Sequence, residues 1–564
     1  MADSSNESLP DPCFQCRSRK THPARRRGAQ ACLNCRLQKA RCSGELPRCI
    51  NCQRRNRECR YPSRQARHSP HKSGEPSRIT YVKQVTGSEL EQGLVYPVKD
   101  SSELETILDN YFLQLYPLPS YSFLHEPSIR RMCTEQTLEP SLVIAICAIV
   151  KLRCRPTGSV PYESAPMVEL AEKRIWDQLE RPSIFRLQAL FLIIQYHAEV
   201  GRVERAFMMA SIASRHVAAL KLNHESPHLG FITQEIRRRA VWTMALLDGY
   251  FSVGLPGYST INYEEIYLRF PCREETFGSP VPEGMGLSVP ETPQVEPTQD
   301  SHSMLELILR ISKIRRDIMR LTRQLALVEH PLRELQSILQ GLRLSLSQIE
   351  GEITSAFGPS TSGSIGIQWE SRWFIRVMEI RLAWHQAYCD LFRLFIPGHP
   401  NSAPDVVLRS MEPSTYVVQA RVICEEHSDW IVNSISEVLE KGVQGFFSFD
   451  IARCTYQATS LSLFLAHMAS ARSSLVPEAV IRNAVSSLKF LQENFASSAH
   501  VQRMISDLKD LIGAYETRGS QLEAALALNS LRSSGDAVER HFQLSVHSLI
   551  HQAHFIDDSY LYER

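Results

Sequence analysis

Three features that the sequence lacks narrow the classes of protein to which it can belong. No apolar run reaches membrane-spanning length; the longest, residues 142–150, has the size of a buried core helix. The first residues, MADSSNESLPDP, are polar and lack the basic-then-apolar order of a secretory signal. A Gly-rich phosphate loop, a nucleophile elbow and an HExxH helix are all missing. We therefore expect a non-enzymatic protein with no membrane partner in the nucleocytoplasmic compartment, where clustered cysteines bind metal more often than they form disulfides.

Acidic residues are scarce at the N-terminal end, although the formal net charge of the whole chain is only +2. Residues 1–80 hold 18 Lys and Arg against 6 Asp and Glu, whereas the remaining 484 residues hold 45 against 55. The chain thus combines a head of net charge +12 with a body of net charge −10. This asymmetry predicts that only the head meets a polyanion.

Composition divides the chain into four parts, and the expected fold class is mainly α. A small N-terminal cysteine cluster is joined by a flexible linker to a large all-α body, where apolar residues recur at helical spacing and alternating strand patterns are scarce. The expected parts are a disordered basic arm at 1–30, the cluster at 31–61, the linker at 62–100 and the helical body at 101–564. A Pro-rich loop at 278–302 and shorter breaks near 358–366 and 397–413 interrupt the helices, which continue to about residue 549.

A heptad-like spacing within the body has two interpretations. The apolar residues are Ile308, Ile311, Ile318, Leu321, Leu325 and Val328, then Leu332, Leu335, Leu339, Leu342 and Leu346. Such spacing is typical of a coiled-coil dimer. Pro331 interrupts it after about three heptads, and this central proline favours an antiparallel helix pair packed inside the body.

Six cysteines near the N-terminus form an internal repeat with a period of 17 residues. They are Cys32, Cys35, Cys42, Cys49, Cys52 and Cys59. A structural zinc takes four ligands and favours thiolate, so a single zinc would leave two cysteines over, whereas two zincs require two sulfurs to bridge. Cys32 and Cys49 are equivalent members of the repeat and are the expected bridges, giving two Zn²⁺ per chain. A segment of about thirty residues cannot bury enough apolar surface to fold alone, so the metal is expected to supply the missing stability.

The remaining cysteines need separate interpretations. Cys13 and Cys16 imitate the first pair of the cluster, and with Cys32 and Cys35 they satisfy a generic four-cysteine zinc spacing. We favour the six-cysteine cluster, because Pro23 stands where a third repeat would need a cysteine. The seven cysteines after residue 61 are scattered singly and are expected to be small buried hydrophobes.

The cluster lies within a longer motif, Ala31-Cys32-x-x-Cys35-Arg36-x-x-Lys39-x-Arg41-Cys42-x-Gly44-x-x-Pro47-x-Cys49-x-x-Cys52, followed by Cys59-Arg60-Tyr61. This motif resembles the fungal binuclear-cluster (Zn2Cys6) transcription factors. The resemblance implies that a short helix after the second cysteine enters the major groove of double-stranded DNA and reads a CGG-like triplet. The implied DNA contacts are Lys39 to guanine O6 and N7, Arg36 and Arg41 near phosphates, Gln38 at a position that is often basic in the family, and Arg54 and Arg55 on the DNA backbone.

Residues 101–277 resemble the middle homology region of the same regulators. The residues that carry this resemblance include Tyr111-Phe112, Phe123-Leu124-His125, Leu187-Gln188-Ala189-Leu190 and Glu235-x-Arg237-Arg238-Arg239-x-x-Trp242. Gly249 and Leu255 depart from the family, which often has arginines there, so we do not carry over a family salt-bridge network. The residues alone predict an i,i+4 pair of Glu235 and Arg239 beside a core-facing Trp242. His125 and His197 are expected to be core histidines rather than metal ligands.

The resemblance implies a sequence-specific regulator of transcription by RNA polymerase II, located in the nucleus, with a body associated with regulation. The alternative is an interaction scaffold or enzyme in which the zinc module is only structural. Residues 62–100 show no sustained heptads, so monomeric binding, homodimerisation through the body and recruitment of co-regulators all stay open, and no residue identifies a small-molecule effector. The basic stretch at 17–27 is typical of a nuclear import signal or of an arm that adds phosphate affinity. The acidic and aromatic residues at 555–562 are interpreted as a frayed terminus in preference to an activation segment.

Overall fold

The computed structural model divides the chain into two compact units, Met1–Val82 and Lys83–Arg564. It describes residues 35, 42–43, 48–55, 57, 59, 101–154, 164–252, 256–278, 303–326, 334–359, 369–411, 413–443, 445–469, 477–516 and 549. In the first unit the structure gives the bounds of α2 (Ile50–Arg54), and Cys35 is helical as well. The second unit is the helical body.

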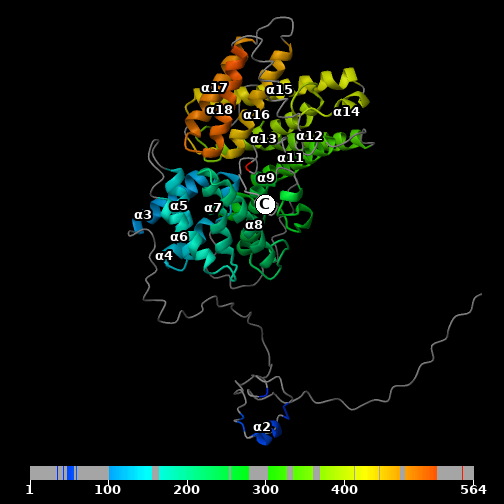
Figure 1. Ribbon diagram of the computed structural model, residues 1–564. Helices are drawn as coiled ribbons and strands as arrows, with labels where there is room; N and C mark the ends of the chain where they lie inside the picture. Colours follow the sequence, from blue (N-terminus) through cyan, green and yellow to red (C-terminus); the bar gives the residue numbers. More distant parts are fainter. Residues whose placement is uncertain are drawn as a thin grey trace, which may run out of the picture. The chain divides into compact units, whose positions relative to one another are not determined.

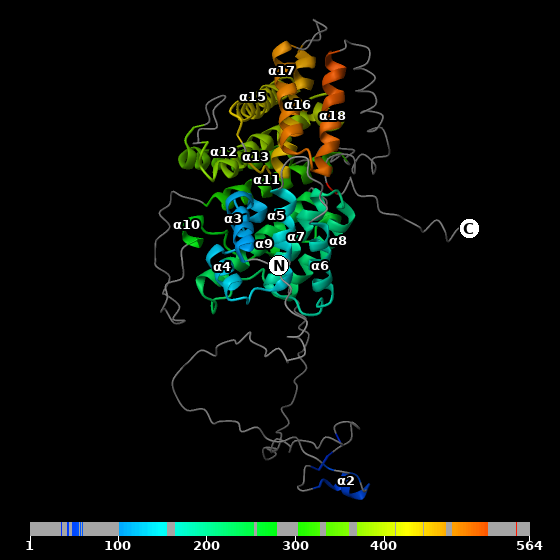
Figure 2. The same cartoon turned by 90° about the vertical axis from the view of Figure 1, so that its left-hand side faces the viewer.

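The body consists of two successive sets of helices (Figures 1 and 2). The first set contains α3 (Ser101–Asn110), η1 (Tyr111–Leu115), η2 (Pro119–Tyr121), α4 (Glu126–Thr134), α5 (Pro140–Arg153), α6 (Ala165–Trp176), α7 (Ile184–Glu199), α8 (Val203–Ala219), α9 (Phe231–Ser252), η4 (Pro256–Tyr258), η5 (Tyr263–Glu265) and α10 (Glu274–Phe277). The second contains α11 (Met304–Ala326), α12 (Leu335–Phe357), α13 (Phe374–Phe392), η6 (Arg393–Phe395), α14 (Asp405–Ser410), α15 (Pro413–Glu440), α16 (Phe449–Ala469), α17 (Glu478–Asn494) and α18 (Ala499–Glu516). Within the described residues no β-strand occurs, and a single isolated bridge pairs His224 with Tyr267. The predicted mainly-α class is therefore confirmed.

Three helices are buried on nearly all sides and form the centre of the body. The apolar run at 142–150 lies in α5 and is fully buried, which confirms its predicted role as a core helix. Helix α7 packs against α5 and α8, whereas α13 packs against α11, α15 and α16. Helices α5 and α7 are largely apolar on every face and belong in the interior, because no face of them can meet water without cost. Helix α13 also buries charged side chains, among them Arg376 and Asp390, which are held in ion pairs. One continuous apolar core includes residues of both helix sets.

The end of the first helix departs from the expected α-helical spacing. Tyr111–Leu115 form a π-helical turn, in which the N–H of Tyr116 donates to the carbonyl of Tyr111 over 2.8 Å. Pro117 has no N–H and cannot extend the ladder, so the helix ends there. Tyr116 is thereby buried, and its hydroxyl donates to Glu274 of α10 over 2.7 Å. Spacing of apolar residues alone did not predict this turn.

The heptad-like stretch forms an antiparallel helix pair inside the body, as the sequence favoured. Arg310, near the start of α11, pairs with Glu352, near the end of α12. The described apolar residues of the stretch are buried except Leu342, which is half-buried. They pack within the body and are therefore unavailable as the seam of a coiled-coil dimer.

A buried network of charges joins four segments of the body. Arg239 of α9, which is 1% exposed, donates to Glu235 one turn earlier, to Glu274 of α10 and to the hydroxyl of Tyr116, each over 3.0 Å. Arg376 of α13 pairs with the second oxygen of Glu274 and donates to the carbonyl of Tyr116 over 2.7 Å. Burial raises the pKa of Glu274, but the two guanidinium groups outweigh it and hold that pKa below its ordinary value. The predicted pair of Glu235 and Arg239 is thus confirmed, but as part of a larger network.

The predicted core histidines, buried cysteines and helix breaks of the body are largely confirmed. Trp242, His125 and His197 are buried, and an Nε2 contact joins His197 to Glu172. Four of the scattered cysteines are buried (Cys147, Cys389, Cys424, Cys454), while Cys133, Cys154 and Cys272 are half-buried. The predicted breaks fall between α12 and α13 and between η6 and α15, around the short helix α14. The arm at 1–30, the linker at 62–100, the loop at 279–302 and the stretches 517–548 and 555–562 lie outside the described residues. No helix in the described part of the chain is long and apolar enough to cross a membrane.

Candidate metal centre

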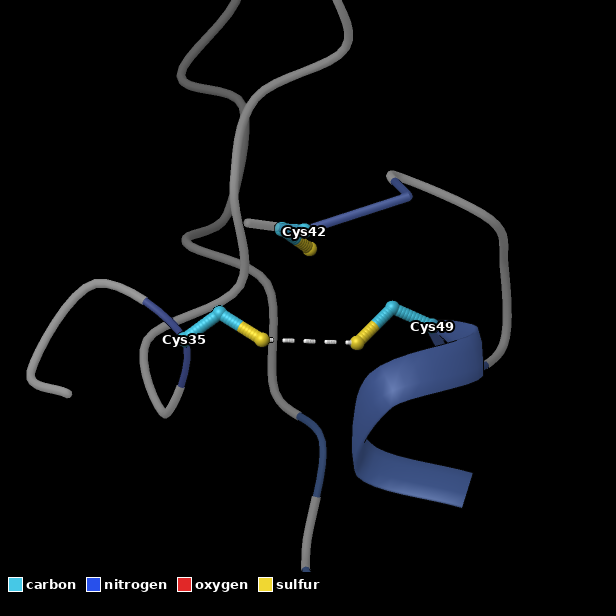
Figure 3. A group of neighbouring side chains, drawn as sticks. All are labelled: Cys35, Cys42 and Cys49. Atoms are coloured by element: carbon cyan, nitrogen blue, oxygen red, sulfur yellow. Dashed lines mark hydrogen bonds between the residues drawn. The ribbon is translucent and has the colours of Figure 1, made fainter. Parts of the chain in front are cut away.

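Five cysteine sulfurs of the first unit form two groups that share one member. Cys35, Cys42 and Cys49 form one group, and Cys49, Cys52 and Cys59 form the other; within each, the Sγ atoms lie within 4.8 Å of one another. Figure 3 shows the first group, with the Cys35 and Cys42 side chains pointing toward Cys49 at the start of α2. Cys49 is therefore placed where one sulfur can contribute to two metal positions.

The distances between sulfurs suit a metal and exclude disulfides in this part of the chain. The Sγ of Cys35 lies 3.7 Å from that of Cys49 and 3.9 Å from that of Cys52. A disulfide needs a separation of about 2.05 Å. Tetrahedral zinc with Zn–S bonds of about 2.3 Å holds its sulfurs about 3.8 Å apart. The five described cysteines form no disulfide, and the two measured sulfur separations match the spacing of a zinc–thiolate site.

The start of α2 stabilises the sulfur of Cys49 in the form that binds metal. Cys49 is the N-cap, and its Sγ accepts the backbone N–H of Cys52 over 3.4 Å. This hydrogen bond lowers the pKa of Cys49 to about 6, and contacts with the other cysteines act in the same direction against the effect of burial. The backbone N–H of Cys49 in turn donates to the Sγ of Cys59 over 3.3 Å. Since the thiolate is the metal-ligating form of cysteine, this arrangement prepares the site for a cation.

Cysteines make up the buried cluster in the described part of the first unit. The buried side chains described there are Cys35, Cys49 and Cys52, and Cys42 and Cys59 pack against them. Sulfur atoms therefore take the place of a hydrophobic core. A unit held in this way depends on metal for stability, on the order of 10 kcal/mol per structural zinc.

The structure also contains a contact that was not predicted from the sequence. Asn51, in the first turn of α2, donates from Nδ2 to the Sγ of Cys35 over 3.3 Å. The sequence carried a signal for it, because the 17-residue repeat places an asparagine at the same position of both halves, Asn34 and Asn51. The spacing of the cysteines predicts the metal ligands but assigns no role to the residues between them.

The predicted DNA contacts are described only in part. Arg54 and Arg55 lie at the end of α2, and both are exposed to solvent, as a phosphate contact requires. The other predicted site residues, Cys32, Arg36, Gln38, Lys39 and Arg41, lie outside the described residues, as do Cys13 and Cys16. The rival four-cysteine site would place Cys35 in a separate cluster, yet Cys35 lies beside Cys49 and Cys52.

Comparison with known proteins finds relatives of one kind. The chain is 28% identical over 211 residues to the Zn(2)-C6 fungal-type transcription factor FTF1c of Fusarium oxysporum f. sp. lycopersici, which covers 34% of this chain and 22% of that protein. It is 26% identical over 192 residues to an uncharacterized transcriptional regulatory protein of Schizosaccharomyces pombe, covering 31% of this chain and 20% of that protein. The alignments thus span about a fifth of the length of these relatives. No solved structure matches the chain.

Two family models match successive parts of the chain. The fungal Zn(2)-Cys(6) binuclear cluster domain matches residues 30–68, which include all six clustered cysteines but neither Cys13 nor Cys16. The fungal specific transcription factor domain matches residues 108–350, from α3 to α12, and so extends beyond residue 277, where the resemblance read from the sequence ended. The chain therefore belongs to the fungal Zn(2)-Cys(6) binuclear-cluster transcription factors, and its cluster domain binds two zinc ions.

Proposed function

We propose that the chain is a sequence-specific DNA-binding regulator of transcription by RNA polymerase II, acting in the nucleus and without enzymatic activity. The observation that carries this proposal is the sharing of Cys49 between two groups of three sulfurs, inside the segment that matches the binuclear cluster domain. A single structural zinc would not require a shared sulfur. The zinc-scaffold alternative explains a metal but not the exposed basic residues beside it.

The zinc ligands in this proposal are the six clustered cysteines. Cys32 and Cys49 bridge, one metal takes Cys35 and Cys42 in addition, and the other takes Cys52 and Cys59. Two Zn²⁺ supply the cross-links that hold a segment whose described buried side chains are cysteines. Six thiolates with two Zn²⁺ leave the cluster at a net charge of −2. The five described sulfurs support this assignment, because they group as it requires.

The basic residues around the cluster provide the DNA contacts of the proposal. Lys39 donates to guanine O6 and N7 in the major groove, which is the commonest specific contact of a basic side chain. Arg36 and Arg41 neutralise phosphates, and Gln38 contributes an amide at the same surface. Arg54 and Arg55 are exposed on α2 and position the module on the DNA backbone without specifying sequence.

The first prediction concerns the Lys39→Ala variant of the full chain loaded with zinc. The affinity difference between a CGG-containing duplex and a scrambled duplex should shrink by about 1–3 kcal/mol, since the specific guanine contact is lost. Fluorescence anisotropy titrations with both duplexes at fixed salt measure this difference. Arg55→Ala is the control: it should weaken binding to both duplexes alike and reduce the salt slope by about 1. A wild-type chain with two zincs and no preference for CGG would reject the proposed function.

Oligomeric state is open in this proposal, and one experiment addresses it. In-vitro site selection with the full chain reports the spacing between selected triplets. A single triplet indicates monomeric binding, whereas two triplets at fixed spacing indicate a homodimer. Because the described heptad-like residues of α11 and α12 are buried or half-buried within the body, a dimer would have to use another surface of the chain.

A further inference from the structure

Asn51 links the two halves of the zinc cluster through its side chain. It lies between Cys49 and Cys52 in the sequence, so its backbone belongs to the second half. Its Nδ2 nevertheless donates to the Sγ of Cys35, in the first half, over 3.3 Å. The residue is half-buried, so the bond is partly shielded from water. Gln53, two residues later on α2, is exposed. Among the described residues its hydrogen bonds are backbone ones: its N–H donates to the carbonyl of Cys49, and its carbonyl accepts the N–H of Arg55.

The chemistry of this contact favours the metal-bound form of Cys35. A zinc-bound thiolate carries negative charge, and an N–H donor directed at it stabilises that charge and fixes the orientation of the sulfur. Hydrogen-bond partners of this kind around a metal contribute about 10–100-fold to metal affinity. A carboxylate at the same position could only accept hydrogen bonds and would repel the thiolate.

We propose that Asn51 is a positioning residue of the zinc cluster, whose side-chain amide holds the Cys35 thiolate in place from the opposite half. The proposal rests on the zinc ligands assigned above and adds a residue that binds neither metal nor DNA. It makes the two metal positions dependent on each other through Asn51 as well as through the shared sulfur of Cys49.

The Asn51→Asp variant separates this role from a role in helix formation. Asn51 is the second residue of α2, where an acidic side chain favours the helix through its N–H groups and dipole. If Asn51 only supported the helix, Asn51→Asp would bind zinc at least as well as the wild type. If it orients Cys35, the variant should lose zinc at a chelator concentration about 10-fold lower. Gln53→Glu is the matched control, because it makes the same amide-to-carboxylate change on the same helix without touching a sulfur.

The experiment uses the full chain and two readouts. Competition with a chromophoric chelator measures zinc retention in the wild type, Asn51→Asp and Gln53→Glu. The same proteins loaded with Co²⁺ report the thiolate-to-cobalt charge-transfer band, which should move to longer wavelength in Asn51→Asp alone, because a sulfur without its N–H donor holds its electrons less tightly. Equal values for Asn51→Asp and Gln53→Glu in either readout would overturn the role of Asn51. A wild-type chain that binds fewer than two zincs would instead refute the ligand assignment itself.

Discussion

Arg239 and Arg130 each form an i,i+4 pair with a glutamate, but only Arg239 is removed from water. The side chains of Arg239 and Glu235 are 1% and 0% exposed, whereas those of Arg130 and Glu126 are 36% and 37% exposed. Loss of one partner of a buried pair leaves an uncompensated charge in the interior, and this costs far more than loss of a pair that water can replace. The two pairs thus offer a test of how much the network stabilises the body.

Arg239→Ala should lower the free energy of unfolding of the body by about 3–5 kcal/mol, since the buried carboxylates of Glu235 and Glu274 each lose one of their two arginine partners. Arg130→Ala should lower it by less than about 1 kcal/mol. Urea titrations followed by tryptophan fluorescence measure both. Similar losses for the two variants would mean that the network contributes no more than a surface pair.

At the residue scale, contacts between residues close together in the sequence were predicted, whereas contacts between residues far apart in the sequence were missed. Glu235 and Arg239 are one helical turn apart, and helical spacing alone places them together. Glu274 and Arg376 are 102 residues apart, and only the packing of α10 and α13 brings them together. The grouping of the five described cysteine sulfurs was predictable for the same reason as the local pair, because their repeat lies within a segment of about thirty residues. The contact of Asn51 was missed because a carboxamide side chain can donate or accept hydrogen bonds with many partners, and its position in the sequence does not identify the partner.

At the scale of elements, the turn between α7 and α8 makes a close approach to the start of α18. Gly201 has a φ of +79°, and a Cβ built on it would lie 2.8 Å from the Cβ of Ala499. Gly201→Ala should therefore destabilise the body by about 1–3 kcal/mol, through both the left-handed backbone and the overlap. Gly249, inside α9, has open space around it, and Gly249→Ala should stabilise by roughly 0.5–1 kcal/mol. Thermal unfolding of both variants measures the two changes, and a neutral Gly201→Ala would contradict the close approach.

A buried pair of histidines joins α13 to α15 and should make the body sensitive to acid. The Nδ1 atoms of His385 and His427 lie 2.8 Å apart, and this bond needs one protonated and one bare nitrogen. The rings stack on Trp430 and Tyr388, respectively. Burial lowers the pKa of His427 to about 4 and that of His385 well below 6.5.

The sign of the effect follows from these pKa values. The unfolded chain takes up protons below pH 6.5 while the folded pair does not, so the pair's contribution is complete above pH 6.5 and is lost as the pH falls toward 4, by up to about 3 kcal/mol for His427. His427→Phe should make the loss of stability between pH 6.5 and pH 4 shallower, as measured by urea midpoints at a series of pH values. His228→Phe changes an exposed histidine and should leave the slope unaltered. If the pH dependence of stability in His427→Phe also equals that of the wild type, the histidine pair is not the cause of the acid sensitivity.

The positions of helix ends were predicted from the sequence more accurately than the packing between helices. Glycine and proline predicted the breaks around α14, because they end helices by local geometry. The heptad-like spacing predicted two helices, and Pro331 correctly favoured an antiparallel pair over a dimer seam. The π-helical turn at Tyr111–Leu115 was not predicted, because the spacing of apolar residues does not distinguish it from an α-helical turn. It is associated with the tertiary hydrogen bond from the hydroxyl of Tyr116 to Glu274.

At the scale of the whole molecule, the two units have separate cores of different chemistry. Sulfur atoms form the buried centre described in the first unit, whereas one continuous apolar cluster forms that of the body. All six tryptophans lie in the second unit: Trp176, Trp242, Trp369, Trp373, Trp384 and Trp430. Tryptophan fluorescence therefore reports on the body alone. The sequence anticipated this division through its charge and cysteine distributions, since both change sharply before the helical body begins.

Removal of zinc should consequently separate the two units in function. A strong chelator should abolish DNA binding by the full chain, because the buried centre described in the first unit consists of cysteines and needs metal to maintain its fold. The tryptophan emission and the thermal midpoint of the body should stay unchanged, because no zinc ligand belongs to its core. Anisotropy with a CGG duplex and fluorescence-detected melting, recorded on the same sample before and after chelation, test both statements, and added Zn²⁺ should restore DNA binding. A fall in the melting temperature of the body on chelation would show that the units stabilise each other and that their cores are not independent.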